Sequence, residues 1–141
     1  MTVKQLSVFL ENKSGRLTEV LQALGESKIS ITALTIADTS EYGVLRLIVA
    51  DQQKAYNVLK EKGFTVQLSD VLCIATSSEA GSFASALQVL SDENISVEYM
   101  YAFSLGNKAA LVIRTESRDK AIAAAQKGNL TLIQTEDLIH I

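Results

Sequence analysis

The 141-residue sequence contains little of what disulfide-linked, metal-binding or membrane-spanning proteins need. It has one cysteine and one histidine, so an intrachain disulfide is excluded, and Cys73 and His140 have no further Cys or His with which to complete a metal site. No stretch approaches the ~20 apolar residues of a membrane span. The N-terminal residues also lack the apolar run of a signal peptide. We therefore expect a cytoplasmic protein that uses no metal and no cofactor.

The charge balance argues against a partner that is a nucleic acid. Thirteen basic and 16 acidic side chains give a net charge of −3, and the pI is near 5.1, whereas nucleic-acid binders usually present a basic surface. The sequence shows no phosphate-binding or dinucleotide-binding glycine pattern and no nucleophile paired with a histidine. Acid–base chemistry by carboxylates stays open, because Asp and Glu are plentiful.

The second half of the chain repeats the first. Ser14–Leu34 aligns with Ala80–Met100 at a constant offset of 66 residues, which places Gly15 on Gly81. Further identities follow in the same order, some at an offset that differs from 66 by one or two residues. Insertions in loops produce such small differences. The chain is therefore predicted to contain two copies of one structural unit, with domains at residues 1–68 and 69–141.

Each half predicts the element order βαββαβ. In the first half, apolar alternation indicates strands, and the i, i+3, i+4 spacing of Leu17, Val20 and Leu21 indicates a helix. We expect Gly25 to stop that helix, and Asp51 to cap the next. The expected strands are 3–10, 29–37, 44–50 and 64–68, with the corresponding second-half strands at 72–76, 95–103, 109–115 and 131–134.

This element order is that of the ferredoxin-like split βαβ unit. The predicted fold class is α+β, with two ferredoxin-like βαββαβ units in tandem and antiparallel sheets side by side with helices on one face. Only Ser69 and Asp70 separate the last strand of one half from the first strand of the next. Two residues are too few for a flexible linker.

The polar glycine turn that follows the first strand resembles that of the ACT domain, a small regulatory module of amino-acid metabolism. The resemblance rests on Glu11–Leu24, "ENKSGRLTEVLQAL", followed by "ISI" at 29–31. In that family an Asp or Asn opens the turn, a glycine follows three residues later, and a Leu or Ile begins the helix. Asn12, Gly15 and Leu17 match these three positions, and the likeness covers essentially the whole chain, twice.

The resemblance implies that a free amino acid binds where the turn of one domain meets the second strand of its neighbour. A helix N-terminus supplies N–H groups for a carboxylate, and an asparagine amide both donates and accepts hydrogen bonds. The expected ligand-binding residues of the first site are Asn12, Lys13, Ser14, Gly15, Arg16, Leu17, Glu98, Met100 and Tyr101.

The second turn departs from the family pattern. Ser78 stands in place of Asn12 and Glu79 in place of Lys13, which removes an amide and adds a negative charge. We therefore expect a second, weaker site. Its expected residues are Ser78, Glu79, Ala80, Gly81, Ser82 and Phe83. Glu79 and Glu98 favour a ligand with an apolar, aromatic or imidazole side chain over an acidic one.

The leading prediction is a non-enzymatic sensor that binds a free amino acid, forms a homodimer and signals to a partner such as a regulated enzyme. A protein–protein adaptor and a small ferredoxin-like enzyme are the alternatives. An RNA-binding module needs aromatic residues on the first and third strands, and residues 44–50 contain none while the first strand offers only Phe9. The glycine turn also has a plainer interpretation, an ordinary capped helix start.

Overall fold

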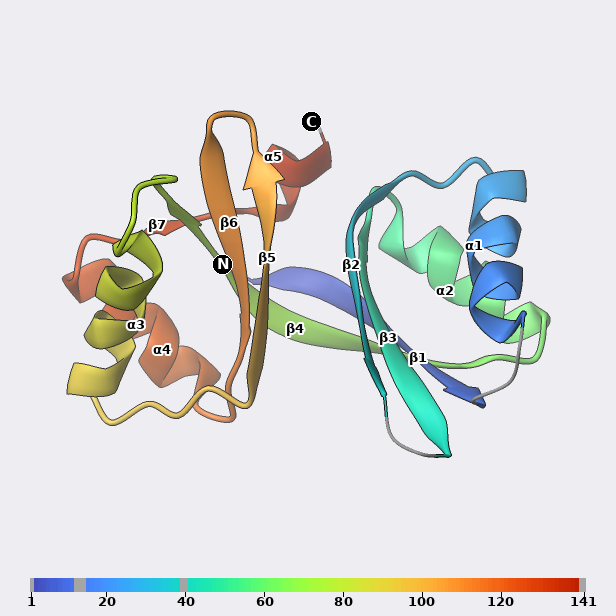
Figure 1. Cartoon of the computed structure of the whole chain (residues 1–141), viewed down its shortest axis with the longest axis horizontal. Helices are drawn as coiled ribbons and strands as arrows, with labels where there is room; N and C mark the ends of the chain where they lie inside the picture. The colour runs from blue at the N-terminus through green and yellow to red at the C-terminus, as the bar shows by residue number, and fades with distance from the viewer. Residues whose placement is uncertain (1, 12–14, 39–40, 140–141) are drawn as a thin grey trace. The chain divides into compact units, whose positions relative to one another are not determined.

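The computed structural model describes residues 2–11, 15–38 and 41–139 (Figure 1). The chain divides into two compact units, Lys4–Ser69 (the first unit) and Asp70–Ile141 with Met1–Val3 (the second unit). Asn12, Lys13, Ser14 and His140 lie outside the described residues. Across the part of the chain that is described, no helix is long and apolar enough to cross a membrane.

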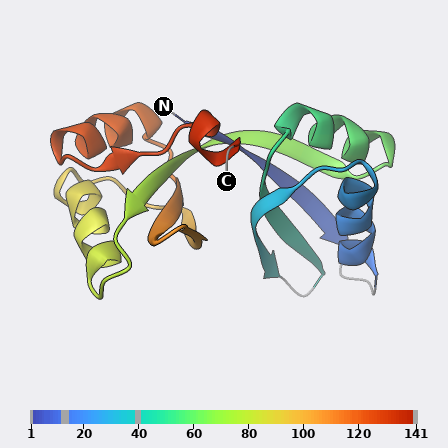
Figure 2. The same cartoon turned by 90° about the horizontal axis from the view of Figure 1, so that it is seen from above.

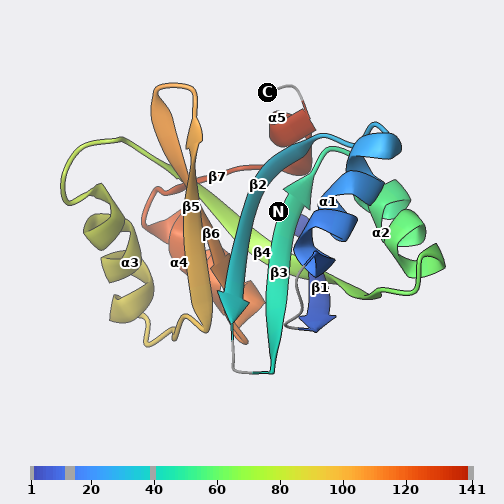
Figure 3. The same cartoon turned by 45° about the vertical axis from the view of Figure 1, so that its right-hand side comes forward.

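The first unit has the predicted βαββαβ order. Its sheet is antiparallel in the order β2-β3-β1-β4, and Figure 3 shows β2 running beside β3. Its elements are β1 (Val3–Glu11), α1 (Arg16–Glu26), β2 (Ile31–Asp38), β3 (Tyr42–Val49), α2 (Gln52–Glu61) and the beginning of β4 (Thr65–Thr76).

The second unit repeats this order, with the end of β4 in the role that β1 has in the first unit. Its strands are ordered β5-β6-β4-β7 and paired antiparallel. Its further elements are α3 (Ser82–Asp92), β5 (Tyr99–Leu105), β6 (Lys108–Arg114), α4 (Arg118–Lys127), β7 (Thr131–Leu132) and α5 (Thr135–Ile139). The prediction of two ferredoxin-like units in tandem is therefore confirmed.

Several boundaries differ from the sequence-based prediction. β5 begins at Tyr99 rather than at residue 95, and β2 and β3 are each shifted by one or two residues at their ends. The strands expected at 64–68 and 72–76 are one continuous strand, β4, because no Gly or Pro interrupts the extended backbone between them. The last strand ends at Leu132, and α5 follows it unpredicted. Asp137 starts this short helix, since its carboxylate accepts the backbone N–H of Gln134 at 2.9 Å in the manner of a capping box.

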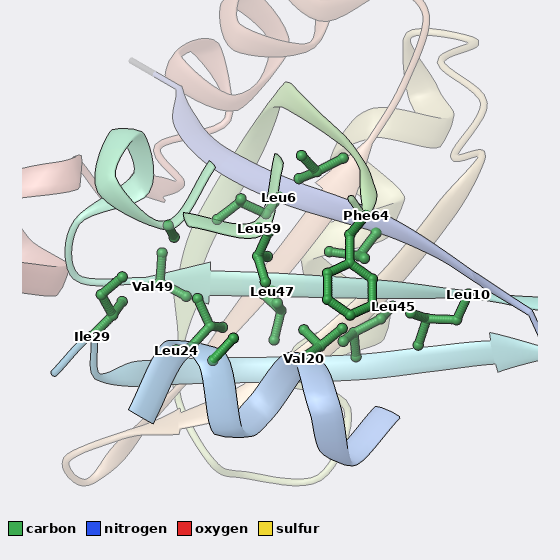
Figure 4. Packing of buried hydrophobic residues seen from close by; sticks show 14 residues of the cluster. Leu6, Leu10, Val20, Leu24, Ile29, Leu45, Leu47, Val49, Leu59 and Phe64 are labelled. Atoms are coloured by element: carbon green, nitrogen blue, oxygen red, sulfur yellow. The ribbon is translucent and has the colours of Figure 1, made fainter. Parts of the chain in front are cut away.

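The core of the first unit lies between its sheet and its two helices. Leu6, Leu45 and Leu47 project from β1 and β3 on one face, and Val20 and Leu24 of α1 pack on them (Figure 4). Alternation along each strand puts these side chains on the same face. Full burial of each leucine contributes roughly 1.5–3 kcal/mol. The helices of this unit accordingly cover that face of its strands (Figure 2).

The second unit has an equivalent core. Leu72 of β4 and Leu111 and Ile113 of β6 pack with Leu90 of α3 and Ala121 of α4. Leu90 lies 66 residues after Leu24, and both are buried. The repeat in the sequence is therefore a repeat of buried positions.

The four longer helices end in the same way. A left-handed residue follows each helix: Lys28, Gly63, Asn94 and Asn129, with φ between 57° and 88°. The next residue donates its N–H to the carbonyl five positions back, at 2.9–3.1 Å, which is the Schellman motif. Gly63 ends α2 as predicted. Gly25 does not end α1, which continues to Glu26.

Candidate functional site

The two glycine turns have the same backbone geometry. Gly15 has φ 86° and Gly81 has φ 88°, and each is the residue immediately before a helix. Their carbonyls accept the first helical hydrogen bonds, from the N–H of Glu19 at 2.9 Å and of Ser85 at 3.0 Å. Apart from the chain neighbours of each glycine, no atom of the described residues lies within 4 Å of the position where a Cβ would stand. Glycine is therefore required by the left-handed backbone, and the space beside each turn is open.

The first turn of α3 has unpaired hydrogen-bond donors. The N–H of Ser82 donates to the Glu79 carbonyl at 3.2 Å, but the N–H groups of Phe83 and Ala84 have no acceptor among the described residues. Gly81 supplies no side-chain cap for this helix. Such free N–H groups, together with the positive end of the helix dipole, favour an anionic partner.

Side-chain hydrogen bonds hold the second turn in place. The Ser77 hydroxyl accepts the N–H of Glu79 at 3.3 Å, and it lies 2.6 Å from the Ser82 hydroxyl. Ser78 donates to the carbonyl of Asn107 at 3.1 Å and so ties the turn to the β5–β6 hairpin. Ser77 was not among the predicted site residues, although serine clusters of this kind are typical turn formers.

A pocket of about 450 Å³ lies between the second turn and the β5–β6 hairpin, and we call it the hairpin pocket. It brings together five of the six residues predicted for the second site, and Ser82 lines a separate cavity instead. The lining of the hairpin pocket consists of residues 78–81, Phe83, Ala84, Ser104, Lys108 and Ala109. Its volume is within the range typical of small-molecule sites.

Two opposite charges border the hairpin pocket without forming an ion pair with each other. Glu79 lies on the turn and Lys108 on the hairpin, and neither side chain makes an ion pair or hydrogen bond with any residue that the structure describes. Lys108 reaches the pocket because Gly106, with φ 62°, closes a two-residue turn that pairs Leu105 with Lys108. Lys108 was not predicted as a site residue, because only tertiary folding brings the hairpin to the turn.

The described residues of the first turn are engaged within their own unit. The Arg16 guanidinium pairs with Glu19 at 2.8 Å and lies 4.8 Å from the centre of the Phe64 ring. Leu17 packs against the core of the first unit. Gly15 therefore has only its backbone to offer a ligand, whereas the side chains of Arg16 and Leu17 stabilise the first unit.

The three residues expected on the opposite wall of the first site belong to the second unit. Glu98 lies 3.8 Å from Arg114, and its backbone N–H donates to the Arg114 carbonyl at 2.9 Å. Met100 packs against the core of the second unit. Tyr101 pairs with Val112, so it points to the sheet face opposite to Met100. That these residues join the first turn in one site stays a prediction.

The chemistry available elsewhere is limited. Within residues 2–11, 15–38 and 41–139, no group of three or more His, Cys, Asp or Glu side chains is arranged to hold a metal. Cys73 is buried, as predicted, and burial raises the pKa of its thiol to about 12.

One premise of the argument against RNA binding was wrong. The third strand was expected to contain no aromatic residue, but β3 begins at the exposed Tyr42.

Comparison with known proteins places these features in context. The family model described as the ACT domain pair matches residues 1–141. The crystal structure of protein BT0572 from Bacteroides thetaiotaomicron is similar over 100% of this chain and 98% of that chain, with 43% sequence identity and a TM-score of 0.94. No curated protein matches the sequence.

Enzyme regulatory subunits share the fold. The ligand-free regulatory subunit of aspartate kinase from Thermus thermophilus is 17% identical, with a TM-score of 0.63, over 89% of this chain and 91% of that chain. A putative C-terminal regulatory domain of aspartate kinase from Porphyromonas gingivalis is 10% identical, with a TM-score of 0.54, over 91% of this chain and 94% of that chain.

Proposed function

This chain belongs to the ACT domain pair family, and from that premise we propose that it is a non-enzymatic sensor of a free amino acid. In this proposal the ligand binds at the glycine turns, and the bound state is passed to a partner such as a regulated enzyme. The observation that carries the proposal is the second turn, where open space beside Gly81 adjoins the N–H groups of Phe83 and Ala84, which no described residue accepts. A carboxylate is the group that such donors bind.

The expected affinity is modest. A free amino acid of about ten heavy atoms, at roughly −0.5 kcal/mol per atom, gives about −5 kcal/mol and a Kd of order 0.1–1 mM. An affinity in this range responds to changes in a metabolite pool. The stronger binding expected at the first turn, because of Asn12, is part of this proposal.

The proposal includes a homodimer that forms through β2. This strand is at the end of the strand order, and its residues Leu34 and Ile36 are 45% and 46% exposed. A charge or a proline usually protects an edge strand from pairing. β2 contains no proline, and its one charged residue is Asp38 at its end. Ile36→Lys is expected to convert the dimer to a monomer in light scattering, and a wild-type monomer would contradict this part.

A thermal-shift screen of the purified protein against all twenty amino acids tests the proposal. At a concentration of about ten times Kd, a ligand adds RT ln 11, about 1.4 kcal/mol, and raises Tm by a few degrees. We expect a selective shift with one or two amino acids, which Asn12→Ala reduces. The absence of any shift would reject the sensor and favour a protein–protein adaptor.

A further inference from the structure

We infer that the hairpin pocket is a binding site in its own right for a zwitterionic amino acid with an apolar side chain. Lys108 would hold the carboxylate of this ligand together with the N–H groups of Phe83 and Ala84, and Glu79 would hold its ammonium group. The inference rests on the proposed function, and it goes further by naming the ligand class and two charged residues that bind it. It also changes the interpretation of the second turn, where Glu79 was expected to weaken the site. With Lys108 facing the turn to bind the carboxylate, the negative charge of Glu79 favours the ammonium group of a zwitterion.

The charges at the pocket support this assignment. A zwitterion has one negative and one positive end, and the pocket has one group complementary to each. Glu79 and Lys108 are not within ion-pair distance of each other, and neither is engaged by another described side chain. Charge-assisted hydrogen bonds are stronger than neutral ones, so a ligand between these two groups would gain at both ends.

The rest of the lining determines which side chains fit. Phe83 keeps 39% of its surface exposed, and the alanines of the turn and hairpin are the other apolar groups. Ser104 is the one further polar side chain from the hairpin. Since the two charged groups are used by the termini of the ligand, a charged ligand side chain would have no partner, whereas an apolar one would cover the Phe83 ring.

The hairpin pocket differs from the site that the family resemblance implies. That site joins the turn of one domain to the second strand of its neighbour. All residues that line the hairpin pocket belong to the second unit, and the Ser78–Asn107 hydrogen bond holds its two sides together. No residue of the first unit is needed to complete it.

Calorimetric titration of the full chain with four small molecules tests the inference. L-phenylalanine and L-leucine have both charged ends, whereas phenethylamine lacks the carboxylate and 3-phenylpropionate lacks the ammonium group. The variants are Lys108→Gln and Glu79→Gln, both at exposed side chains. The matched control is Lys120→Gln, an exposed lysine of α4 in the same unit that does not line the pocket.

In an Asn12→Ala background, which weakens the stronger binding expected at the first turn, we expect Lys108→Gln to weaken L-phenylalanine binding about tenfold or more. This is the usual effect of losing a hydrogen bond to a charged group. The same change should leave phenethylamine binding unaltered, and Glu79→Gln should give the converse pattern with 3-phenylpropionate. Lys120→Gln should bind as the wild type does. This pairing of each variant with one truncated ligand separates a direct contact from a general loss of structure.

Two results would overturn the inference, and they are distinguishable. If Lys108→Gln and Glu79→Gln bind L-phenylalanine and L-leucine as the wild type does, while Asn12→Ala loses binding, the sensor proposal stands and the ligand site is elsewhere. If the wild type binds neither L-phenylalanine nor L-leucine, this inference fails. If the thermal-shift screen also gives no shift with any of the twenty amino acids, the proposed function fails as well.

Discussion

The two glycine turns have the same backbone conformation but different neighbouring residues. Gly15 and Gly81 have φ values within 2° of each other, and a helix starts directly after each. In the second unit the turn is bound to its hairpin and faces Lys108. In the sequence, the residue 66 positions before Lys108 is Tyr42. Two turns can therefore keep the same helix start while their neighbouring residues present different side chains to the space beside them.

Truncation of the equivalent core leucine to alanine in each unit should have the largest effect on stability. It tests whether the two cores are equivalent. Leu24 and Leu90 are 0% and 1% exposed, so Leu24→Ala and Leu90→Ala should each lower the free energy of unfolding by about 2–5 kcal/mol. Denaturant unfolding measures both. If one of the two variants lost less than about 1 kcal/mol, the two cores would not be equivalent.

Substitution of the turn glycines tests whether the shared backbone is required. Gly15→Ala and Gly81→Ala place a Cβ on a left-handed residue, which costs about 1–2 kcal/mol. No described residue would clash with the new Cβ in either case, so the expected loss is the same at both turns. Thermal unfolding of the pair is the measurement. An unchanged Tm for one variant alone would break the equivalence.

The second helix of each unit begins differently, and this gives a smaller contrast. The Asp51 carboxylate accepts the N–H of Lys54 at 3.1 Å at the start of α2, whereas Ser117 makes no side-chain cap for α4. Asp51→Ala should therefore cost about 1 kcal/mol, and Ser117→Ala much less. Chemical denaturation of the two variants compares them, and an equal loss would contradict the assigned cap.

The smallest effect concerns a thiol that the first unit lacks. Burial raises the pKa of Cys73 to about 12, and the residue 66 positions earlier is Ser7. Because the folded thiol stays protonated while the unfolded one ionises, stability should fall as the pH rises above the ordinary pKa of a thiol. Cys73→Ser should remove this slope. Rapid alkylation of Cys73 in the folded wild type at pH 8 would contradict its burial.

The sequence predicted the parts of the structure that local patterns determine. Alternation, helical spacing and the 66-residue repeat indicated the element order, and Gly63 and Asp51 marked a helix end and a helix start correctly. The left-handed residues Lys28, Asn94 and Asn129 were missed, because non-glycine residues in that conformation give only a weak sequence signal.

What the sequence could not predict depends on contacts between distant segments. The hairpin pocket forms because Ser78 bonds to Asn107 and Lys108 follows the hairpin turn. No spacing rule links these residues to the turn of Ser78. The continuity of β4 was missed for a related reason, since polar residues such as Ser69 and Asp70 imitate a loop when their backbone is extended.

The most direct test of amino-acid binding at the turns is an NMR titration of the ¹⁵N-labelled protein with L-leucine. The backbone N–H groups of Phe83 and Ala84 have no acceptor among the described residues, so they report on a carboxylate arriving at the second turn. We expect saturable shifts of these two amides and of Gly81. If all amide shifts were absent, or if they occurred only far from both glycine turns, the account would be contradicted.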